Sequence, residues 1–290
     1  MSKDTLVLRA ARWLRARVRW LAEHAAAQPV CARPFFAERR HRSAYPVLDE
    51  QGLLATKRSD TLFVFGSGAS LNDVSEAEWR RIAEHDTIGF NYFLRQSFVR
   101  ASYHLVGEIA TGNDHEPSRW IPAIQEYARL IAENPRYRDC VLLVQAGWRA
   151  YQSNRLVASG CLPLATRLYR YRRIARGVYR PPTRSLREGL VHGAGTVVGC
   201  VSFGVAMGYR RIVIAGVDLY DSRYFWLPPD VGRPDALEHK GLTQEARHST
   251  AATIVPYLGR WAEWLKADAV ALEVYDARSL LAKVLPVHAG

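Results

Sequence analysis

The sequence predicts an α/β fold: a Rossmann-like parallel sheet with helices on both faces. Short apolar segments of strand length alternate along the chain with longer segments in which apolar residues recur at helical spacing. This alternation favours a parallel sheet, because a helix usually returns the chain to the start of the next strand. The chain has 290 residues, 48% of them hydrophobic, which is enough to bury the core of such a sheet.

The first 58 residues are expected to precede this domain as a basic amphipathic helix and an irregular connector over 27–58. Between Leu6 and Leu21 apolar residues recur at threes and fours, and five arginines fill the other face. Such a helix suits an anionic membrane surface, and a helix packed on the domain fits the same pattern. The arginines interrupt any transmembrane span or signal-peptide core, so we expect a cytoplasmic protein, peripherally associated with the inner membrane.

The core domain is predicted over residues 59–290. Its strands are short runs rich in β-branched and aromatic residues, and the first of them ends at a turn of small residues. A helix then begins after Ser75, because Glu78 completes a capping box. The later helices carry an apolar stripe or, after Gly195, an apolar run closed by Gly208. Strands are expected at 61–65, 86–90, 101–106, 140–145, 211–218 and 270–275, and further helices at 120–131, 197–207 and 249–266, with a short terminal helix.

Two segments have no regular pattern. Residues 162–190 interleave arginines with tyrosines and fit nucleic-acid binding, a grip on an acidic glycan or lipid phosphate, or a solvated surface. Residues 221–247 are polar and contain three prolines, which predicts a long loop, a lid or insertion on the acceptor side.

Charge and cysteine content narrow the classes of partner. With 40 Lys and Arg against 28 Asp and Glu, the formal charge of +12 favours polyanionic partners without choosing among them. The four cysteines lie far apart, so neither a disulfide framework nor a zinc site is expected. We expect no metal and no other cofactor.

Distinctive residues fall where the predicted strands end. In a parallel sheet these ends share one edge, where ligands gather. The turn 66–70, Asn91 and Asp218 follow three strands, and Gly195-Thr196 opens a helix. The turn could let a nucleotide approach the backbone, but it lacks the Walker A lysine and the third glycine of the dinucleotide fingerprint, so a simple strand-to-helix turn also fits.

Three residues could perform chemistry. His248, at a helix start after the long loop, could act as a general base, although a histidine there also fits a cap. Tyr220 and Tyr224 could hydrogen-bond a departing phosphate without a metal, or could be ordinary loop packing.

Taken in order, four motifs resemble the bacterial sialyltransferases of glycosyltransferase family 42. They are Phe63-Val64-Phe65-Gly66-Ser67-Gly68-Ala69-Ser70, Gly89-Phe90-Asn91-Tyr92-Phe93, Gly195-Thr196 through Asp218-Leu219-Tyr220, and Arg247-His248-Ser249 with Ser279-Leu280-Leu281. They extend over about residues 61–286.

The resemblance implies a metal-independent, inverting transfer of a keto-sugar from a CMP-activated donor to a saccharide or glycolipid acceptor. It makes His248 the base, and Tyr220 and Tyr224 the groups that stabilise the leaving phosphate. It implies a role in cell-surface polysaccharide or lipopolysaccharide biosynthesis. The expected donor-binding residues are Gly66, Ser67, Gly68, Ser70, Asn91, Gly195, Thr196 and Asp218.

The donor sugar and the function itself each have alternatives. Ser67 and Ala69 stand where the family has Asn and Pro, so Kdo or another nonulosonate stays open as the donor sugar. A pterin diphosphokinase of similar fold would need magnesium. A dinucleotide-dependent oxidoreductase and a basic nucleic-acid-binding protein are further alternatives, although nucleic acid is not the expected partner. The sequence leaves the acceptor, the linkage and the oligomeric state open.

Overall fold

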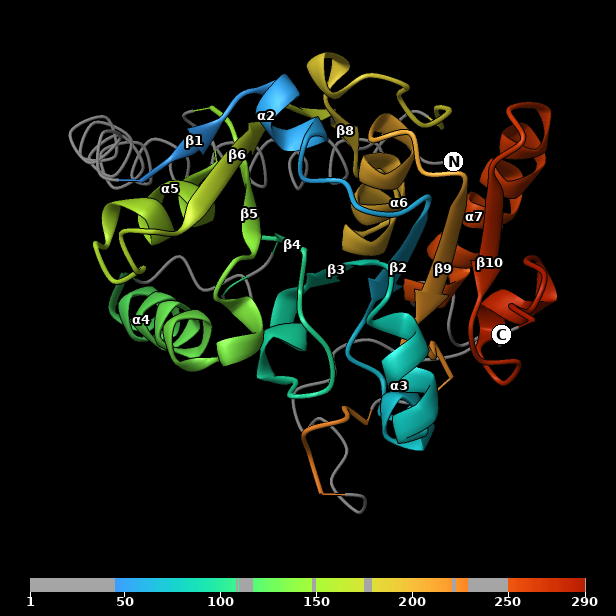
Figure 1. Ribbon diagram of the computed structural model, residues 1–290, viewed down its shortest axis with the longest axis horizontal. Coiled ribbons are helices and arrows are strands. Elements are labelled where there is room, and N and C mark those ends of the chain that lie inside the picture. The colour runs from blue at the N-terminus through green and yellow to red at the C-terminus, as the bar shows by residue number, and fades with distance from the viewer. Residues whose placement is uncertain are drawn as a thin grey trace, which may run out of the picture.

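The computed structural model of the chain contains an eight-stranded sheet in which neighbouring strands are parallel (Figure 1). It describes residues 45–107, 109, 117–147, 150–174, 179–220, 223–228 and 250–289. The strand order is β1-β6-β5-β4-β3-β2-β9-β10, which confirms the predicted Rossmann-like sheet. The strands are β1 Val47–Leu48, β2 Thr61–Phe65, β3 Asp86–Phe90, β4 Tyr103–Leu105, β5 Val141–Gln145, β6 Arg167–Tyr171, β9 Arg211–Ala215 and β10 Ala271–Val274; β7 Arg173–Ile174 and β8 Leu190–Val191 form a separate pair.

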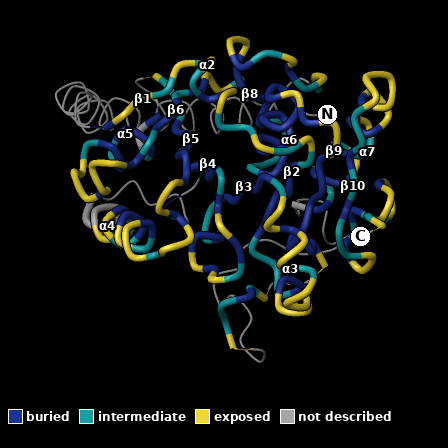
Figure 2. Tube along the Cα trace, in the orientation of Figure 1, coloured by how far each residue is buried: buried dark blue, intermediate teal, exposed yellow. Residues whose placement is uncertain are grey.

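Helices cover both faces of this sheet, and their outer sides are exposed while the strands are mostly buried (Figure 2). One face packs against α6 and α7, and the other against α3, α4 and α5. The helices are α2 Glu50–Leu54, α3 Glu76–Ile82, α4 Pro117–Glu133, α5 Tyr151–Ala158, α6 Thr196–Ala206 and α7 Thr250–Ala267.

Strand β2 shows how the sequence assigns the two faces. Leu62 and Val64 are fully buried in a core cluster that includes α6 and α7. Phe63 and Phe65 belong to a second cluster with Trp79 of α3. Successive side chains of a strand point to opposite faces, so a strand between two helical layers needs an uninterrupted apolar run. The sequence 61–65 supplies that run.

The order of the strands reverses at β2. From β2 the chain adds β3, β4, β5 and β6 on one side, and β9 then pairs with the other side of β2. The register places Leu62 opposite both Asp86 of β3 and Ile212 of β9. In open α/β sheets, ligands bind outside the carboxyl ends of the strands at such a reversal. The boundary between β2 and β9 is therefore the first place to search for a site.

All six predicted strands are present, but one ends early. β9 stops at Ala215 instead of residue 218, because Gly216 adopts a left-handed conformation with φ of 64° and turns the chain. The predicted capping box is confirmed: the Ser75 hydroxyl accepts from the Glu78 backbone, and the Glu78 carboxylate accepts from the Ser75 N–H at 2.8 Å.

The expectation of an irregular connector over 27–58 is wrong from Val47 onward. β1 adds an edge strand by pairing Val47 with Leu168, and Leu53 of α2 is fully buried. The two-residue strand is too short to leave a pattern in the sequence. Residues 1–44, which include the predicted amphipathic helix, lie outside the described residues.

The arginine- and tyrosine-rich segment also contains regular structure. Strand β6 occupies its first part, with Leu168 and Tyr171 buried. Arg167 and Arg170 concealed this strand, because they interrupt the apolar run that a buried strand usually shows. The 3-10 helix Leu186–Glu188 and β8 follow within the same segment.

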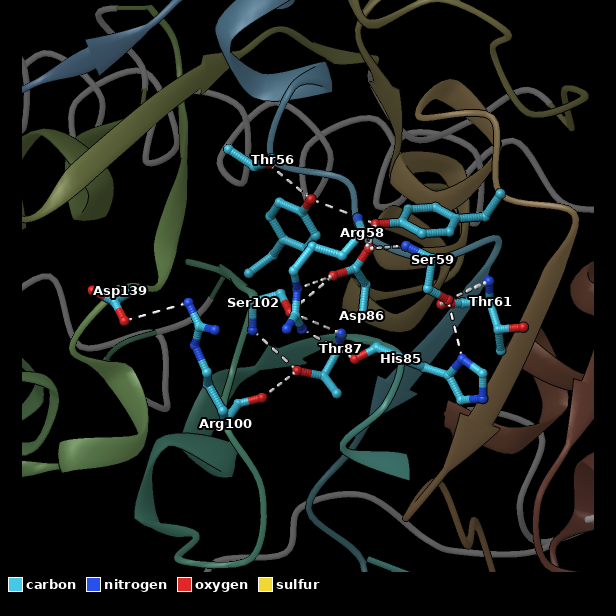
Figure 3. Close-up of polar contacts among 12 residues, drawn as sticks. Thr56, Arg58, Ser59, Thr61, His85, Asp86, Thr87, Arg100, Ser102 and Asp139 are labelled. Carbon is cyan, nitrogen blue, oxygen red and sulfur yellow. Dashed lines mark hydrogen bonds and ion pairs between the residues drawn. The ribbon is translucent and has the colours of Figure 1, made fainter. Parts of the chain in front are cut away.

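A polar network closes the amino end of the sheet (Figure 3). Asp86, at the start of β3, is fully buried and its carboxylate accepts five hydrogen bonds. Arg58 donates from its backbone N–H at 2.7 Å and from Nε at 3.1 Å. The Ser59 N–H, the Ser102 hydroxyl and the Tyr209 hydroxyl donate at 3.2, 3.3 and 2.9 Å. The five hydrogen bonds of this carboxylate therefore stabilise the fold.

Candidate functional site

The glycine turn after β2 is bonded to the end of β9. The Gly66 N–H donates to Ala215 O at 2.9 Å, and the Gly68 N–H donates to Gly216 O at 2.7 Å. A Cβ added at Gly66 would lie 2.3 Å from the Gly216 carbonyl oxygen, so only glycine permits this approach. The turn therefore spans the point where the strand order reverses, as nucleotide-binding turns in open α/β sheets do.

Asp218 and Ser70 join the two strand ends more firmly. Asp218 is 4% exposed, and its carboxylate accepts from the Ser70 N–H at 3.1 Å and from the Ser70 hydroxyl. A Cβ at Gly68 would lie 2.3 to 2.7 Å from that carboxylate. Asp218 therefore accepts from a backbone amide of the turn across the boundary between the two strands. This contact orients the turn.

Strained backbone also concentrates at this edge. Asn91 directly follows β3 with φ of 51°, and Leu219 follows Asp218 with φ of 65°. Left-handed backbone costs a leucine about 1–3 kcal/mol and persists only where the surroundings hold it. Elsewhere among the described residues, Ala269 has a similar φ of 54° in the turn between α7 and β10. Strain of this kind at strand ends is typical of ligand-binding sites.

A second group of predicted residues meets one strand further along. A Cβ at Gly107, just after β4, would lie 3.1 Å from the Asn91 Oδ1 and 3.0 Å from the Thr196 Oγ1. Thr196 is the first residue of α6, and the Gly195 cap supplies no side-chain hydrogen bond. The first-turn N–H groups of a helix attract anions. The ends of β3 and β4 and the start of α6 are thus brought together.

The described part of the predicted lid packs against the glycine turn. Gly68 forms an antiparallel bridge with Tyr224, and the Phe225 N–H donates to Ser67 O at 3.2 Å. The Asn72 side chain donates to Phe225 O at 3.0 Å. This places Tyr224 beside the turn, and its role at the leaving phosphate stays a prediction. Tyr220 lies two residues after Asp218 and is 39% exposed.

The rest of the predicted chemistry falls on undescribed residues. His248 and most of the lid, residues 229–247, lie outside the described part of the chain, so the expected base stays a prediction. Among the described residues, no group of three or more His, Cys, Asp or Glu side chains could hold a metal ion.

One buried histidine near the site can be assigned a structural role. His104 of β4 is fully buried, and its two ring nitrogens hydrogen-bond the hydroxyls of Tyr137 at 3.0 Å and Tyr127 at 2.7 Å. Burial lowers the pKa of His104 to about 3. The ring is therefore neutral at physiological pH and ties β4 to α4.

Gly107 and Trp226 shape this edge but were not predicted, and Ser279 was named only as part of the fourth motif. Ser279 donates its hydroxyl to Val217 O at 2.7 Å, which fixes the chain entering Asp218. Gly107 leaves room for Asn91 and Thr196, and Trp226 stacks on Tyr224 with ring centroids 4.6 Å apart. The Tyr-Phe-Trp run at 224–226 was a usable signal for aromatic packing. The contacts of Ser279 and Gly107 left no pattern in the sequence.

Two further findings concern the described residues as a group. Among the described residues, no helix has the combination of length and apolar character that crossing a bilayer requires. Cys140, Cys161 and Cys200 are free thiols, and Cys31 lies outside the described residues.

Comparison with known proteins adds little. No protein-family model and no curated protein matches the chain. It is similar to the MAf glycosyltransferase of Magnetospirillum magneticum AMB-1, with 17% sequence identity and a TM-score of 0.48. The match covers 79% of this chain and 33% of that protein, so this chain spans about a third of its length. Nothing about activity follows from a similarity this low.

Proposed function

We propose that the chain is a glycosyltransferase that moves a sialic acid or a related keto-sugar from a CMP-activated donor to a saccharide acceptor. One observation carries the proposal. Two clusters of the expected donor-binding residues, drawn from distant segments, lie at the carboxyl edge of the sheet: the turn 66–70 with Asp218, and Asn91 with Thr196. Nucleotides bind at this edge in open α/β sheets. The sequence motifs described above supply the choice of CMP and of the sugar.

The proposed reaction is a single displacement. The acceptor hydroxyl attacks the anomeric carbon of the sugar while the bond from that carbon to the CMP phosphate oxygen breaks, which inverts the configuration. His248 would take the proton of the hydroxyl, and the hydroxyls of Tyr220 and Tyr224 would donate hydrogen bonds to the departing phosphate. The N-terminus of α6 at Thr196 would add N–H groups that favour an anion.

In this proposal the protein needs no metal and no resident cofactor. The other residues bind and orient: Asp218 holds the turn, and Asn91 holds the sugar. Residues 221–247 would close over the donor and exclude water, which protects an activated sugar from hydrolysis. We further propose that the enzyme works at the cytoplasmic face of the inner membrane, with the basic N-terminal segment on anionic lipid.

Nucleotide binding tests the proposal most directly. Calorimetry on the full chain, without divalent metal, would compare CMP with ADP, GDP and NAD. We expect CMP to bind most tightly and His248→Ala to keep that affinity while losing transfer from CMP-Neu5Ac or CMP-Kdo. Binding that requires magnesium and prefers another nucleotide would contradict the proposal and favour a phosphotransferase.

A further inference from the structure

A row of aromatic rings extends along the carboxyl edge, beside the proposed donor site. The rings of Tyr224 and Trp226 are stacked, with centroids 4.6 Å apart and planes 9° apart. The Trp226 ring in turn lies 6.0 Å from the ring of Tyr92. Tyr92 follows Asn91 at the end of β3, and its hydroxyl donates to Ile109 O at 2.9 Å, just beyond β4. The row therefore leads from the glycine turn to the end of β4.

Core packing of Phe225 holds the row in place, although the rings of the row stay partly exposed. The Phe225 ring packs in the core against Phe93, with centroids 6.2 Å apart, which anchors the segment that presents Trp226. Tyr92, Tyr224 and Trp226 are each of intermediate burial. Tryptophan side chains offer a large rigid surface that loses little conformational entropy on binding. A supported, partly exposed indole beside a proposed transfer site is suited to a ring-shaped ligand.

The position of the row favours a sugar over the nucleotide. The strand order reverses between β2 and β9, and the nucleotide is expected to bind there. The row of rings leads away from that point, past the end of β3 and toward the end of β4. The rings also pack with the core clusters on the face opposite α6, whose N-terminus would attract the phosphate. The ring faces of Tyr92, Tyr224 and Trp226 carry no charge that would bind a phosphate, and only the Tyr224 hydroxyl is assigned to it. What remains for them is the neutral part of the reaction, the acceptor.

We propose that Trp226, backed by Tyr224 and flanked by Tyr92, binds the pyranose ring of the saccharide acceptor by stacking. This rests on the proposed function, because an acceptor subsite needs a transferase. The Tyr224 hydroxyl stays with the leaving phosphate, and its ring supports the indole. Trp226 thus determines which acceptor ring is accepted, without taking part in proton transfer.

Fluorine NMR of the full chain labelled with 5-fluorotryptophan tests this. The chain has eight tryptophans, and Trp226→Phe assigns the signal of interest. The probes are lactose and the methyl pyranosides of galactose, glucose and N-acetylglucosamine, each titrated with CMP present. We expect at least one of them to shift the Trp226 signal saturably, and Trp226→Ala to weaken that binding about tenfold.

Trp264 is the matched control. It is 40% exposed and packs on one aromatic ring, Tyr179, with centroids 5.2 Å apart, but it lies near the end of α7 that leads into the start of β10. We expect the saccharides to leave its signal unchanged and Trp264→Ala to leave saccharide binding unchanged. An equal shift of both signals would mean non-specific binding and would overturn the proposal.

Two other outcomes separate this proposal from the proposed function. If CMP alone shifts the Trp226 signal and no saccharide does, the row serves the nucleobase: the acceptor subsite is refuted while the transferase stands. If nothing shifts the signal, the subsite is also refuted. Calorimetry with CMP on the same sample then shows whether the proposed function survives.

Discussion

Two buried carboxylates stand at opposite edges of the sheet and have different surroundings. Asp86, at the amino edge, is fully buried and accepts five hydrogen bonds from its own chain (Figure 3). Asp218, at the carboxyl edge, is 4% exposed and accepts two from Ser70, in a neighbourhood of glycines and left-handed backbone. The first network joins β3 to three other parts of the chain. The second network joins the turn 66–70 to Asp218, just after β9.

The difference separates stability from binding. A buried charge is costly unless it is paired and hydrogen-bonded, and Asp86 meets that condition through Arg58, Ser59, Ser102 and Tyr209. Burial, and then the neighbouring Tyr103 and Asp86, raise the pKa of the Tyr209 hydroxyl, which therefore stays a donor. At the carboxyl edge, Asn91 and Leu219 keep left-handed backbone conformations that cost free energy. We therefore expect substitutions at the amino edge to change mainly stability, and those at the carboxyl edge to change mainly nucleotide binding.

The largest effect is expected from Asp86→Ala. Removing the carboxylate leaves the charge of Arg58 and several buried donors without their acceptor. We expect the free energy of unfolding to fall by about 3–5 kcal/mol, measured by urea denaturation. Asp60→Ala is the control, because Asp60 is 70% exposed and pairs with Lys57 at the surface. We expect Asp60→Ala to lower the free energy of unfolding by less than about 1 kcal/mol. Equal losses in the two variants would show that the network does not stabilise the fold.

The next effect is expected from Gly68→Ala. The new methyl group would lie 2.3 Å from the Asp218 carboxylate, and neither that side chain nor the turn can move without breaking the Ser70 contacts. We expect a loss of about 2–3 kcal/mol in stability. CMP affinity should fall more than tenfold under conditions where the variant is fully folded.

Gly208→Ala is not a suitable control for it, because Gly208 has φ of 73° and the substitution would be strained in itself. Gly52 is better, since it lies in a helix, its φ is not left-handed, and the atom nearest to a Cβ there is the capping Asp49 carboxylate at 3.1 Å. Gly52→Ala should leave CMP binding intact. Unchanged CMP binding in Gly68→Ala would separate the turn from the nucleotide site.

A pH effect of intermediate size is expected from His104, which lies between the two edges. Its pKa of about 3 in the folded chain is below its ordinary value of 6.5, so the unfolded chain binds the proton first as the pH falls. Its contribution is therefore constant above pH 6.5 and is lost progressively below it, by about 1.4 kcal/mol per pH unit. Between pH 6.5 and 5, the free energy of unfolding should fall by about 2 kcal/mol through this residue.

His104→Asn isolates this contribution. The amide can still bond one of the two tyrosine hydroxyls but does not titrate. We expect the variant to be less stable at pH 7 and to lose less stability than the native chain between pH 6.5 and 5. Urea denaturation at several pH values measures both. An identical pH dependence in the two proteins would show that His104 is not the group responsible.

The sequence predicted the central strands of the sheet better than β1 and β6, the two strands at one side of it. The central strands are uninterrupted apolar runs, because both faces of the sheet are covered, and this makes residues such as Phe63 and Val213 easy to assign. β1 and β6 were missed for physical reasons. β1 is only two residues long, and β6 contains two arginines among its five residues, so neither has the composition of a central strand.

The candidate site was predictable only in part. Strand ends can be inferred from strands, which is why Asn91 and Asp218 were identified. Contacts between side chains of distant segments leave no local pattern, so the approach of Gly107 to Thr196 could come only from coordinates. The reversal of strand order at β2 was equally hidden, since it depends on where β9 pairs.

The smallest change in stability, and the sharpest test of the comparison, is expected from Asn91→Gly. Asn91 has φ of 51°, a conformation that glycine adopts without strain, so the loss of the side chain should be nearly balanced by the relief of the backbone. We expect the free energy of unfolding to change by less than about 0.5 kcal/mol. Asn91→Ala, which keeps the strain, should be about 1 kcal/mol less stable than the glycine variant.

Binding should respond to these two variants differently from stability. Both lack the carboxamide whose Oδ1 faces the end of β4, so both should lose affinity for the CMP-activated sugar, or for a non-hydrolysable analogue of it, by about tenfold. CMP alone, which lacks the sugar, should bind both variants as it binds the native chain. Equal binding of the sugar nucleotide by all three proteins would remove Asn91 from the site. A loss that followed stability, larger in the alanine variant than in the glycine variant, would mean that the carboxyl edge behaves like the amino edge, with its residues serving the fold first.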